Sequence, residues 1–308
     1  MTLKRFFLAL ALSFLTSTAL ALDLASLEED NLHLASVKAA VVDLESGELL
    51  YSKHADWAAP IASVTKLMTA VVVMDSGAPL DEWITVEKRH FKPVNNAYSR
   101  IRIGSQLKRG DMVRIALMSS ENLAAYTLAR QSPQGYDAFI AAMNRKAKEL
   151  GMVNSHFVDS SGLSPKNHSS AADLAKLVAA AYKYEPLRRY TTTSYYRAHF
   201  RSPRYSLSYG NTNVLVHRNS WHVQLSKTGY LKEAGRCLVM VSEIKGRPMG
   251  LILLDSFGSR SPLGDAGRVK RWLTTGKGGS IAGAALRYEQ RKSLQYPHNQ
   301  VEQQASAN

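Results

Sequence analysis

The chain has 308 residues, with 39 lysines and arginines against 25 aspartates and glutamates, which gives a formal net charge of +14 at pH 7. A basic surface favours acidic partners such as a carboxylate-rich polymer, an anionic membrane or nucleic acid. The single cysteine, Cys237, excludes an intramolecular disulfide. The nine histidines are scattered and form no His-Glu-x-x-His sequence, so we expect no metal site and no cofactor.

The first residues have the pattern of an export signal. A basic Lys4-Arg5 pair precedes a largely apolar run over residues 6–20, which ends in the small-x-small cleavage sequence Ala19-Leu20-Ala21. We therefore expect residues 1–21 to be a signal peptide and the mature protein to be periplasmic. The apolar run is too short for a stable membrane span, so we expect no stable membrane anchor after the signal is removed.

The chain after the signal begins with a predicted hairpin and a predicted buried helix. Residues 37–44 and 48–52 have strand patterns and flank a Gly-containing turn. Pro60 is placed to begin a helix, because its missing N–H costs nothing in the first turn. Lys66 is the one charged residue between positions 57 and 74, so we expect this helix, with its lysine, to be buried nearly all round.

The same helix brings a hydroxyl and an amine together. Ser63 lies one helical turn before Lys66, near the positive end of the helix dipole. Burial lowers the pKa of a lysine, and a neutral amine beside a serine hydroxyl is a general base for a nucleophile. Ser-x-x-Lys is also a common spacing, with on the order of one or two expected by chance, so the motif predicts little by itself.

The middle of the chain is predicted to be mostly helical. A polar stretch that reaches about Gly110 is interpreted as a surface excursion. Helices are then expected over residues 111–117, 123–130 and 135–150. The capping sequence Ser170-Ala171-Ala172-Asp173 begins another helix, which ends near Tyr184.

Residues 182–209 hold seven of the fourteen tyrosines, interleaved with five arginines. Alternating basic and aromatic residues can bind single-stranded nucleic acid by stacking and charge. Because the chain carries an export signal, we interpret the run instead as half-exposed strands or as a groove that faces a polymer. We expect no nucleic-acid partner.

The last third of the chain contains strand patterns over residues 223–230, 236–243 and 249–255, followed by a short helix over 265–272. Mixed strands and helices in this order predict an α+β fold, an antiparallel sheet with flanking helices and a helical subdomain. Residues 22–275 are expected to form the catalytic domain. Residues 276–308 are Gly-rich and then Gln/Asn-rich, so we expect a polar, mobile tail.

Three short motifs occur in a fixed order, Ser63-Val64-Thr65-Lys66, Ser120-Glu121-Asn122 and Lys227-Thr228-Gly229. In these motifs the chain resembles the penicillin-binding active-site-serine acyltransferases, and within them the low-molecular-mass D-alanyl-D-alanine carboxypeptidases and endopeptidases. The sequences Asp159-Ser160-Ser161-Gly162-Leu163 and Asn211-Thr212-Asn213 support the resemblance. The endopeptidase branch is the most similar, because Glu121 stands where many carboxypeptidases carry glycine. The resemblance implies a β-lactamase/DD-peptidase-like fold.

The resemblance also assigns roles to the residues that would carry out the chemistry. Ser63 would be the nucleophile that forms an acyl-enzyme, and Lys66 the general base that takes its proton. Ser120 would relay a proton to the leaving amine. Asn122 would hold Lys66 and the substrate amide.

A second group of residues would bind the substrate. Lys227 would attract a carboxylate and favour a neutral Lys66, and Thr228 would donate a hydrogen bond to that carboxylate. Gly229 would let the substrate backbone approach the strand edge. The backbone amides of Ser63 and Tyr230 would form the oxyanion hole.

The function implied is that of an exported serine DD-peptidase that binds peptidoglycan muropeptides and β-lactams. It would hydrolyse D-alanyl bonds, with cross-links between D-alanine and diaminopimelate as the preferred target, and other cell-wall enzymes are conceivable partners. A D-alanyl-D-alanine carboxypeptidase on the same site and a non-catalytic peptidoglycan-binding module are the alternatives. A β-lactamase is disfavoured, because the expected region holds no Glu-x-x-x-Asn segment for water activation.

Overall fold

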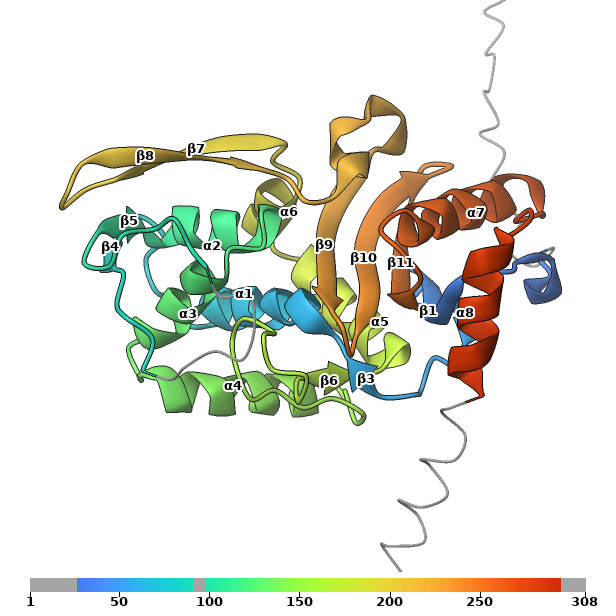
Figure 1. Ribbon diagram of the computed structural model, residues 1–308, viewed down its shortest axis with the longest axis horizontal. Coiled ribbons are helices and arrows are strands. Elements are labelled where there is room, and N and C mark those ends of the chain that lie inside the picture. Colours follow the sequence, from blue (N-terminus) through green and yellow to red (C-terminus); the bar gives the residue numbers. More distant parts are fainter. Residues whose placement is uncertain (1–26, 91–97, 295–308) are drawn as a thin grey trace, which may run out of the picture.

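A five-stranded antiparallel sheet stands at the centre of the computed structural model, which describes residues 27–90 and 98–294 (Figure 1). The signal peptide expected over residues 1–21 lies outside the described residues. The strand order is β2-β1-β11-β10-β9, with bounds β1 (Ser36–Asp43), β2 (Leu49–Lys53), β9 (Val223–Leu231), β10 (Gly235–Ile244) and β11 (Arg247–Ser256). The predicted N-terminal hairpin and C-terminal strands are therefore confirmed, and the sheet joins them by pairing β1 with β11.

Helices cover both faces of the sheet, because its long strands are apolar on both sides. Along β10, Val239 and Val241 face one core while Leu238 and Met240 face the other. The first core is shared with α5 (Ala171–Tyr182) and the second with α7 (Ser261–Thr275). This two-sided burial fixes the register of the strands, since a slip by one residue would exchange the two faces.

The helical subdomain is built around α1 (Thr65–Asp75), which contacts α2, α3, α4 and α5. Every residue from Thr65 to Val73 is buried, including Lys66, as the apolar run predicts. The other helices of this layer are α2 (Arg109–Met118), α3 (Asn122–Arg130), α4 (Tyr136–Glu149) and α6 (Glu185–Thr191).

Pro60 does not begin the helix. It lies in a short strand, β3 (Ala59–Pro60), that pairs with β6 (His168–Ser169). A 3-10 turn, η3 (Ala62–Val64), separates this strand from α1. Tertiary pairing with the 168–169 segment therefore overrides the local preference of proline for the first helical position.

Two ribbons lie on the outer side of α2 (Figure 1). The expected surface excursion contains one, formed by β4 (Trp83–Thr85) and β5 (Gln106–Lys108). The tyrosine-rich run forms the other, with β7 (Tyr195–Phe200) and β8 (Tyr205–Gly210). In β7, residues 195, 197 and 199 are exposed while 198 and 200 are buried, so these strands are half-exposed as predicted.

The segment expected to be a mobile tail contains a helix, α8 (Gly283–Ser293), which packs against β1 and β11. Tyr288 donates a hydrogen bond of 2.6 Å to Asp255 Oδ1, and Glu289 forms a 3.0 Å ion pair with Lys53. These contacts attach a helix that is polar overall and in which Ala285 and Glu289 are the buried residues. None of the helices in the described ranges is long and apolar enough to cross a membrane.

We predict that Trp272→Ala removes a large share of the stability. Its ring is fully buried between α7 and the sheet, lies edge-on to Tyr51, and donates from Nε1 to the Glu28 carbonyl at 3.0 Å. Loss of a buried aromatic ring of this kind costs about 3–5 kcal/mol in the free energy of unfolding, measurable by urea denaturation. Val153→Ala, at a side chain that is 84% exposed, should cost less than about 0.5 kcal/mol. Equal costs for the two variants would contradict this prediction.

Candidate active site

Ser63 and Lys66 meet at the start of α1. Ser63 lies in the 3-10 turn and Lys66 in the first helical turn, so a separation of three residues places both side chains on the same side. Lys66 Nζ lies 2.8 Å from Ser63 Oγ. The predicted pair of nucleophile and base is thus within hydrogen-bonding distance.

Two further oxygens surround the amine of Lys66. It donates to Asn122 Oδ1 at 2.7 Å and to the backbone carbonyl of Ser161 at 2.5 Å. A carbonyl oxygen can only accept, so these two oxygens occupy both N–H groups of a neutral amine. Its lone pair then remains for the hydroxyl proton of Ser63.

Burial keeps that amine neutral over part of the physiological range. Lys66 is 1% exposed, and its burial is the main cause that lowers its pKa to about 7. The negative charges of Asp159 and Glu121 oppose this shift, while Arg89 adds to it. At a pH above about 7 most Lys66 side chains are therefore able to accept a proton.

A tight loop presents the Ser161 carbonyl to Lys66. The buried Asp159 carboxylate accepts hydrogen bonds from the backbone N–H of Ser161 at 2.6 Å, of Gly162 at 2.7 Å and of Ser164 at 2.9 Å. Gly162 has a φ of +78°, and a Cβ there would lie 1.9 Å from the carbonyl oxygen of Ala62. Only glycine lets this loop press against the turn that carries Ser63.

Ser120 and Lys227 form the second hydroxyl–amine pair of the site. Ser120 joins α2 to α3 with a φ of +61°, which a serine rarely adopts. From β9, Lys227 donates to Ser120 Oγ at 3.0 Å and to the Thr228 carbonyl at 2.7 Å. Burial, and then repulsion from Lys66, hold the pKa of Lys227 well below its ordinary value.

The edge strand β9 lies directly against the turn that carries Ser63. A Cβ at Gly229 would be 3.0 Å from the carbonyl oxygen of Ile61 and 3.2 Å from the backbone nitrogen of Ser63. Glycine is needed at this position because the two backbones approach so closely. The neighbouring Thr228 hydroxyl lies 2.7 Å from that of Thr212.

One cavity of about 1070 Å³ collects the predicted site residues. Ser63, Ser120, Asn122 and the Thr228–Tyr230 segment line it, while Lys66 and Lys227 lie behind its wall and bond to lining groups. All eight residues predicted from the motifs are therefore in one place. The arrangement is suited to a nucleophile with a buried base, beside a second hydroxyl that accepts from an amine.

Sequence reasoning did not identify every group around the site. The sequence Asp159–Leu163 supports the resemblance but does not identify the Ser161 carbonyl as a partner of Lys66. The motifs assign no role to Glu121; in the structure its carboxylate accepts from the Leu123 N–H at 3.1 Å and caps α3. Across the described residues, no group of three or more His, Cys, Asp or Glu side chains is placed to hold a metal ion.

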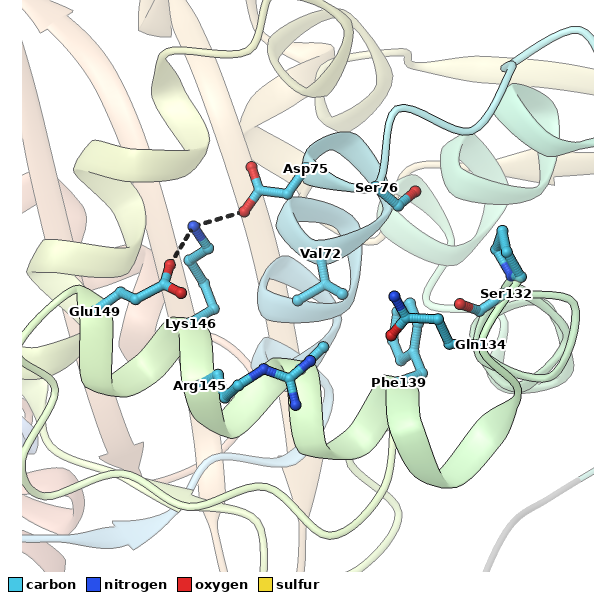
Figure 2. Close-up of a pocket in the computed structure, with 11 residues that line it drawn as sticks. Val72, Asp75, Ser76, Ser132, Gln134, Phe139, Arg145, Lys146 and Glu149 are labelled. Carbon is cyan, nitrogen blue, oxygen red and sulfur yellow. Dashed lines mark ion pairs between the residues drawn. The ribbon is translucent and has the colours of Figure 1, made fainter.

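A second cavity, of about 320 Å³, lies at the opposite end of α1 and is lined largely by α4 (Figure 2). Its lysine, Lys146, is held by Asp75 at 2.7 Å and by Glu149 at 2.8 Å. These two ion pairs raise the pKa of Lys146. A permanently charged lysine cannot serve as a base, so this cavity lacks the chemistry of the first.

Comparison with protein families matches residues 25–258 to the D-alanyl-D-alanine carboxypeptidase family, peptidase family S11. The D-alanyl-D-alanine endopeptidase of Escherichia coli K12 is 46% identical over 262 residues, which cover 85% of this chain and 84% of the relative. The D-alanyl-D-alanine endopeptidase of Pseudomonas aeruginosa is 46% identical over 255 residues, covering 83% of this chain and 82% of the relative.

Solved structures share the fold. The DD-transpeptidase of Streptomyces K15 superposes with a TM-score of 0.72 at 27% identity, over 83% of this chain and 97% of that one. Penicillin-binding protein D2 of Listeria monocytogenes, solved in its cefotaxime-bound form, superposes with a TM-score of 0.69 at 28% identity, over 80% of this chain and 99% of that one. The predicted β-lactamase/DD-peptidase-like fold is confirmed.

We predict that Gly162→Ala destabilises the protein far more than Gly246→Ala. Both glycines have a φ close to +78°, but a Cβ at Gly246 meets open space. The two variants therefore share a backbone cost of about 1–2 kcal/mol, and the variant at Gly162 adds the clash with Ala62. We expect an excess of at least about 2 kcal/mol in the free energy of unfolding, measured by chemical denaturation. Similar costs at both positions would show that the loop does not press on the Ser63 turn.

Proposed function

This chain belongs to the D-alanyl-D-alanine carboxypeptidase family and is therefore a serine-type DD-peptidase; we propose that it is an endopeptidase that cuts the D-alanyl cross-links of peptidoglycan through an acyl-enzyme on Ser63. The endopeptidase names of the E. coli and P. aeruginosa relatives support this choice of bond. The observation that carries the proposal is the buried amine of Lys66, which lies 2.8 Å from Ser63 Oγ and donates to two carbonyl oxygens. In its neutral form these two bonds use both N–H groups and leave the lone pair for the Ser63 hydroxyl.

Acylation begins when Ser63 Oγ attacks the carbonyl carbon of the D-alanyl residue and Lys66 takes the hydroxyl proton. The tetrahedral oxyanion is stabilised by the backbone N–H groups of Ser63 and Tyr230. Collapse of this intermediate breaks the C–N bond. Ser120, polarised by Lys227 at 3.0 Å, passes its proton to the departing amine and receives in return the proton that Lys66 took from Ser63, so Lys66 is neutral again in the acyl-enzyme.

Deacylation uses water in place of the amine. Lys66 receives the proton of the water as its oxygen attacks the ester, and Ser63 leaves with a proton returned through the same amine. The acyl group is released as a carboxylic acid, and the site returns to its starting protonation state. The sum of both steps is hydrolysis of one peptide bond.

Substrate binding uses the edge of β9. Thr228 donates a hydrogen bond to the carboxylate on the departing residue, and the buried amine of Lys227 supplies the nearby positive charge when it is protonated. Gly229 admits the substrate backbone, and Asn122 contacts the substrate amide while it holds Lys66 at 2.7 Å. The excess of basic residues suits a polymer whose peptides carry carboxylates.

β-Lactams would acylate the same serine, because their carbonyl and carboxylate follow the same arrangement. The Listeria neighbour was solved with cefotaxime bound, which supports this expectation for the shared fold. We place the enzyme in the periplasm after cleavage of residues 1–21, where its substrate lies. The pattern of the first residues supports this location.

A carboxypeptidase is the second candidate, since it would use the same nucleophile and base and differ only in the leaving group. The family description names that activity. Mass spectrometry of purified muropeptides after incubation separates the two. Conversion of dimers to monomers identifies an endopeptidase, and loss of one terminal D-alanine identifies a carboxypeptidase.

We predict that Ser63→Ala abolishes both covalent labelling by penicillin and cleavage of muropeptides while the protein remains folded. The removed oxygen is the one that forms the ester, and the alanine fits the same space. Labelling is measured by gel fluorescence with a fluorescent penicillin, and folding by thermal unfolding. Ser220→Ala, at an exposed serine outside the cavity, is the matched control and should behave as the wild type. Residual cleavage by Ser63→Ala would remove this serine from the mechanism.

We also predict that the rate constant of acylation by penicillin rises with pH through about 7. Burial lowers the pKa of Lys66 to about 7, so below that pH the amine is increasingly protonated and cannot accept the Ser63 proton. The rate should fall about tenfold per pH unit on the acid side and level off above neutrality. Stopped-flow or quenched labelling between pH 5 and 9 measures it. A flat profile would mean that Lys66 is not the base.

A further inference from the structure

The two ribbons on the outer side of α2 present a surface that the active site does not use (Figure 1). The β4–β5 ribbon is joined to the β7–β8 ribbon by Gln106 and Arg201, whose backbones exchange hydrogen bonds of 2.8 and 3.0 Å. Paired residues of an antiparallel sheet have their side chains on the same face. The Arg201 Nε accordingly donates to Gln106 Oε1 at 2.8 Å. The two ribbons therefore share one outer face.

We call this surface the ribbon face. Alternate positions of the strands are buried against the helices, as at Leu107 and Ala198, and the positions between them point outward. The larger outward side chains are those of Trp83, Lys108, Tyr195, Arg197, His199 and Arg201. With a rise of about 3.3 Å per residue, the row from Tyr195 to Arg201 is about 20 Å long.

The ribbon face carries positive charge that no acidic residue balances. The strands β4, β5, β7 and β8 contain no aspartate or glutamate. Lys108, Arg197 and Arg201 form no ion pair within residues 27–90 and 98–294. Such a face favours an anionic partner, and arginine binds carboxylates with a matched pair of N–H donors.

The two acidic residues that flank β4 are paired elsewhere. Glu82 bonds to Arg109, and Glu87 lies 2.9 Å from Arg130. Their charges are therefore already compensated by cations outside the ribbon face.

Aromatic rings lie among these cations. Trp83 has the Arg201 guanidinium 4.1 Å from its ring centre and the Lys108 amine at 5.9 Å, so this ring holds two cations close together. Tyr195 is 77% exposed and offers a ring face to a ligand. The electron-rich face of an aromatic ring packs well against the C–H groups of a sugar ring. Cations beside an exposed ring suit a polymer that carries both sugars and carboxylates.

A membrane surface fits this face less well. The aliphatic residues of the four strands, such as Ile84 and Leu107, occupy the inward positions. Segments that lie on a membrane insert an apolar face between the lipids. The ribbon face has charges and rings but no aliphatic side chain to insert.

One end of the ribbon face adjoins the cavity at Ser63. Tyr195 pairs with Gly210, and two residues further along the chain Thr212 lines that cavity and lies 2.7 Å from the Thr228 hydroxyl. The Tyr195 ring also lies 5.0 Å from the ring of His217, in the turn η4 (Val214–His217), whose first residues line the cavity. A polymer with one segment at Ser63 can therefore place another segment on the ribbon face.

We propose that the ribbon face is a second binding site for peptidoglycan, which holds the enzyme on the polymer while the cavity at Ser63 acts on it. Lys108, Arg197 and Arg201 pair with carboxylates of the stem peptides, and Tyr195 packs against a sugar. The identity of the polymer rests on the proposed function. None of these side chains lines the cavity at Ser63, so the ribbon face contributes to binding and not to the chemical step.

The test measures sedimentation of the mature protein with purified peptidoglycan sacculi, after acylation by penicillin has closed the cavity to stem peptides. The acylated wild type should sediment with the sacculi, less so as the salt concentration rises. Lys108→Ala combined with Arg197→Ala should weaken this binding about fivefold, because two exposed ion pairs are lost. For the unacylated double variant, kcat/KM on a soluble muropeptide dimer and the rate of penicillin acylation should stay within about twofold of the wild type.

Lys148→Ala combined with Arg287→Ala is the matched control. These residues are exposed on α4 and α8, and the change removes the same number of positive charges. The control should sediment as the wild type does. Thermal unfolding checks each variant, and Arg197→Glu, at one exposed side chain of β7, tests the proposal even where the double variant unfolds.

Three results would overturn the inference. Unchanged binding of the ribbon variants would show that this face does not hold the polymer, and an equal loss in the control would show that only the net charge matters. Binding to vesicles of phosphatidylglycerol, lost in the ribbon variants while sedimentation with sacculi is unchanged, would identify a membrane as the partner. Failure of the proposed function looks different, because the wild type would then leave the soluble dimer intact whatever its sedimentation with sacculi.

Discussion

The structure depends on the burial of one amine. Lys66 is enclosed by α1, by Asn122 at the start of α3 and by the Ser161 carbonyl, and this enclosure lowers its pKa to about 7. An exposed lysine would keep its proton and could not activate Ser63. The cost of burying a lysine is limited because, in the neutral form, each of its hydrogen-bonding groups has a partner. The surroundings of Lys66 thus favour its neutral amine, which is the form able to accept a proton.

Several unusual backbone conformations support that enclosure. Gly162, at a φ of +78°, lets the Asp159 loop press against the turn that carries Ser63, and Ser120, at +61°, directs its hydroxyl to Lys227. A positive φ is ordinary for glycine, whereas in serine it is strained and persists only where the surroundings hold it in place. Here four N–H and O–H groups bonded to the Asp159 carboxylate hold the loop. Rigidity in the supporting shell is therefore part of how the nucleophile is positioned.

The position of β9 gives the site two different sides. β9 is the last strand of the sheet. One of its edges pairs with β10, and the other faces the turn that carries Ser63. Alternation along the strand sends Lys227 toward Ser120 in the helical layer and leaves Tyr230 on the α7 side with Arg236. The groups that we propose for catalysis thus lie on the helical side of this strand, while Tyr230 and Arg236 lie on its other side.

The sequence by itself determined those helices and strands that depend on residues near one another in the chain. Apolar residues all round predicted the buried helix that holds Lys66, the spacing of three residues predicted its contact with Ser63, and the strand patterns predicted the sheet. The ordered motifs, through resemblance, predicted that Ser120 and Lys227 belong to the same site, and in the structure these residues, 107 positions apart, form a hydrogen bond.

Only the tertiary structure decided which distant groups complete the site. The Ser161 carbonyl that fixes the Lys66 amine comes from 95 residues away, and a backbone carbonyl leaves no trace in residue type. Pro60 pairs with His168 although its local preference is to begin a helix. The polar segment that forms α8 is held by Asp255, which accepts from Tyr288, and by Lys53, which pairs with Glu289. The periodicity of apolar residues predicts that a side chain is buried. It does not predict which residues cover that side chain, because this depends on how separate segments of the chain pack.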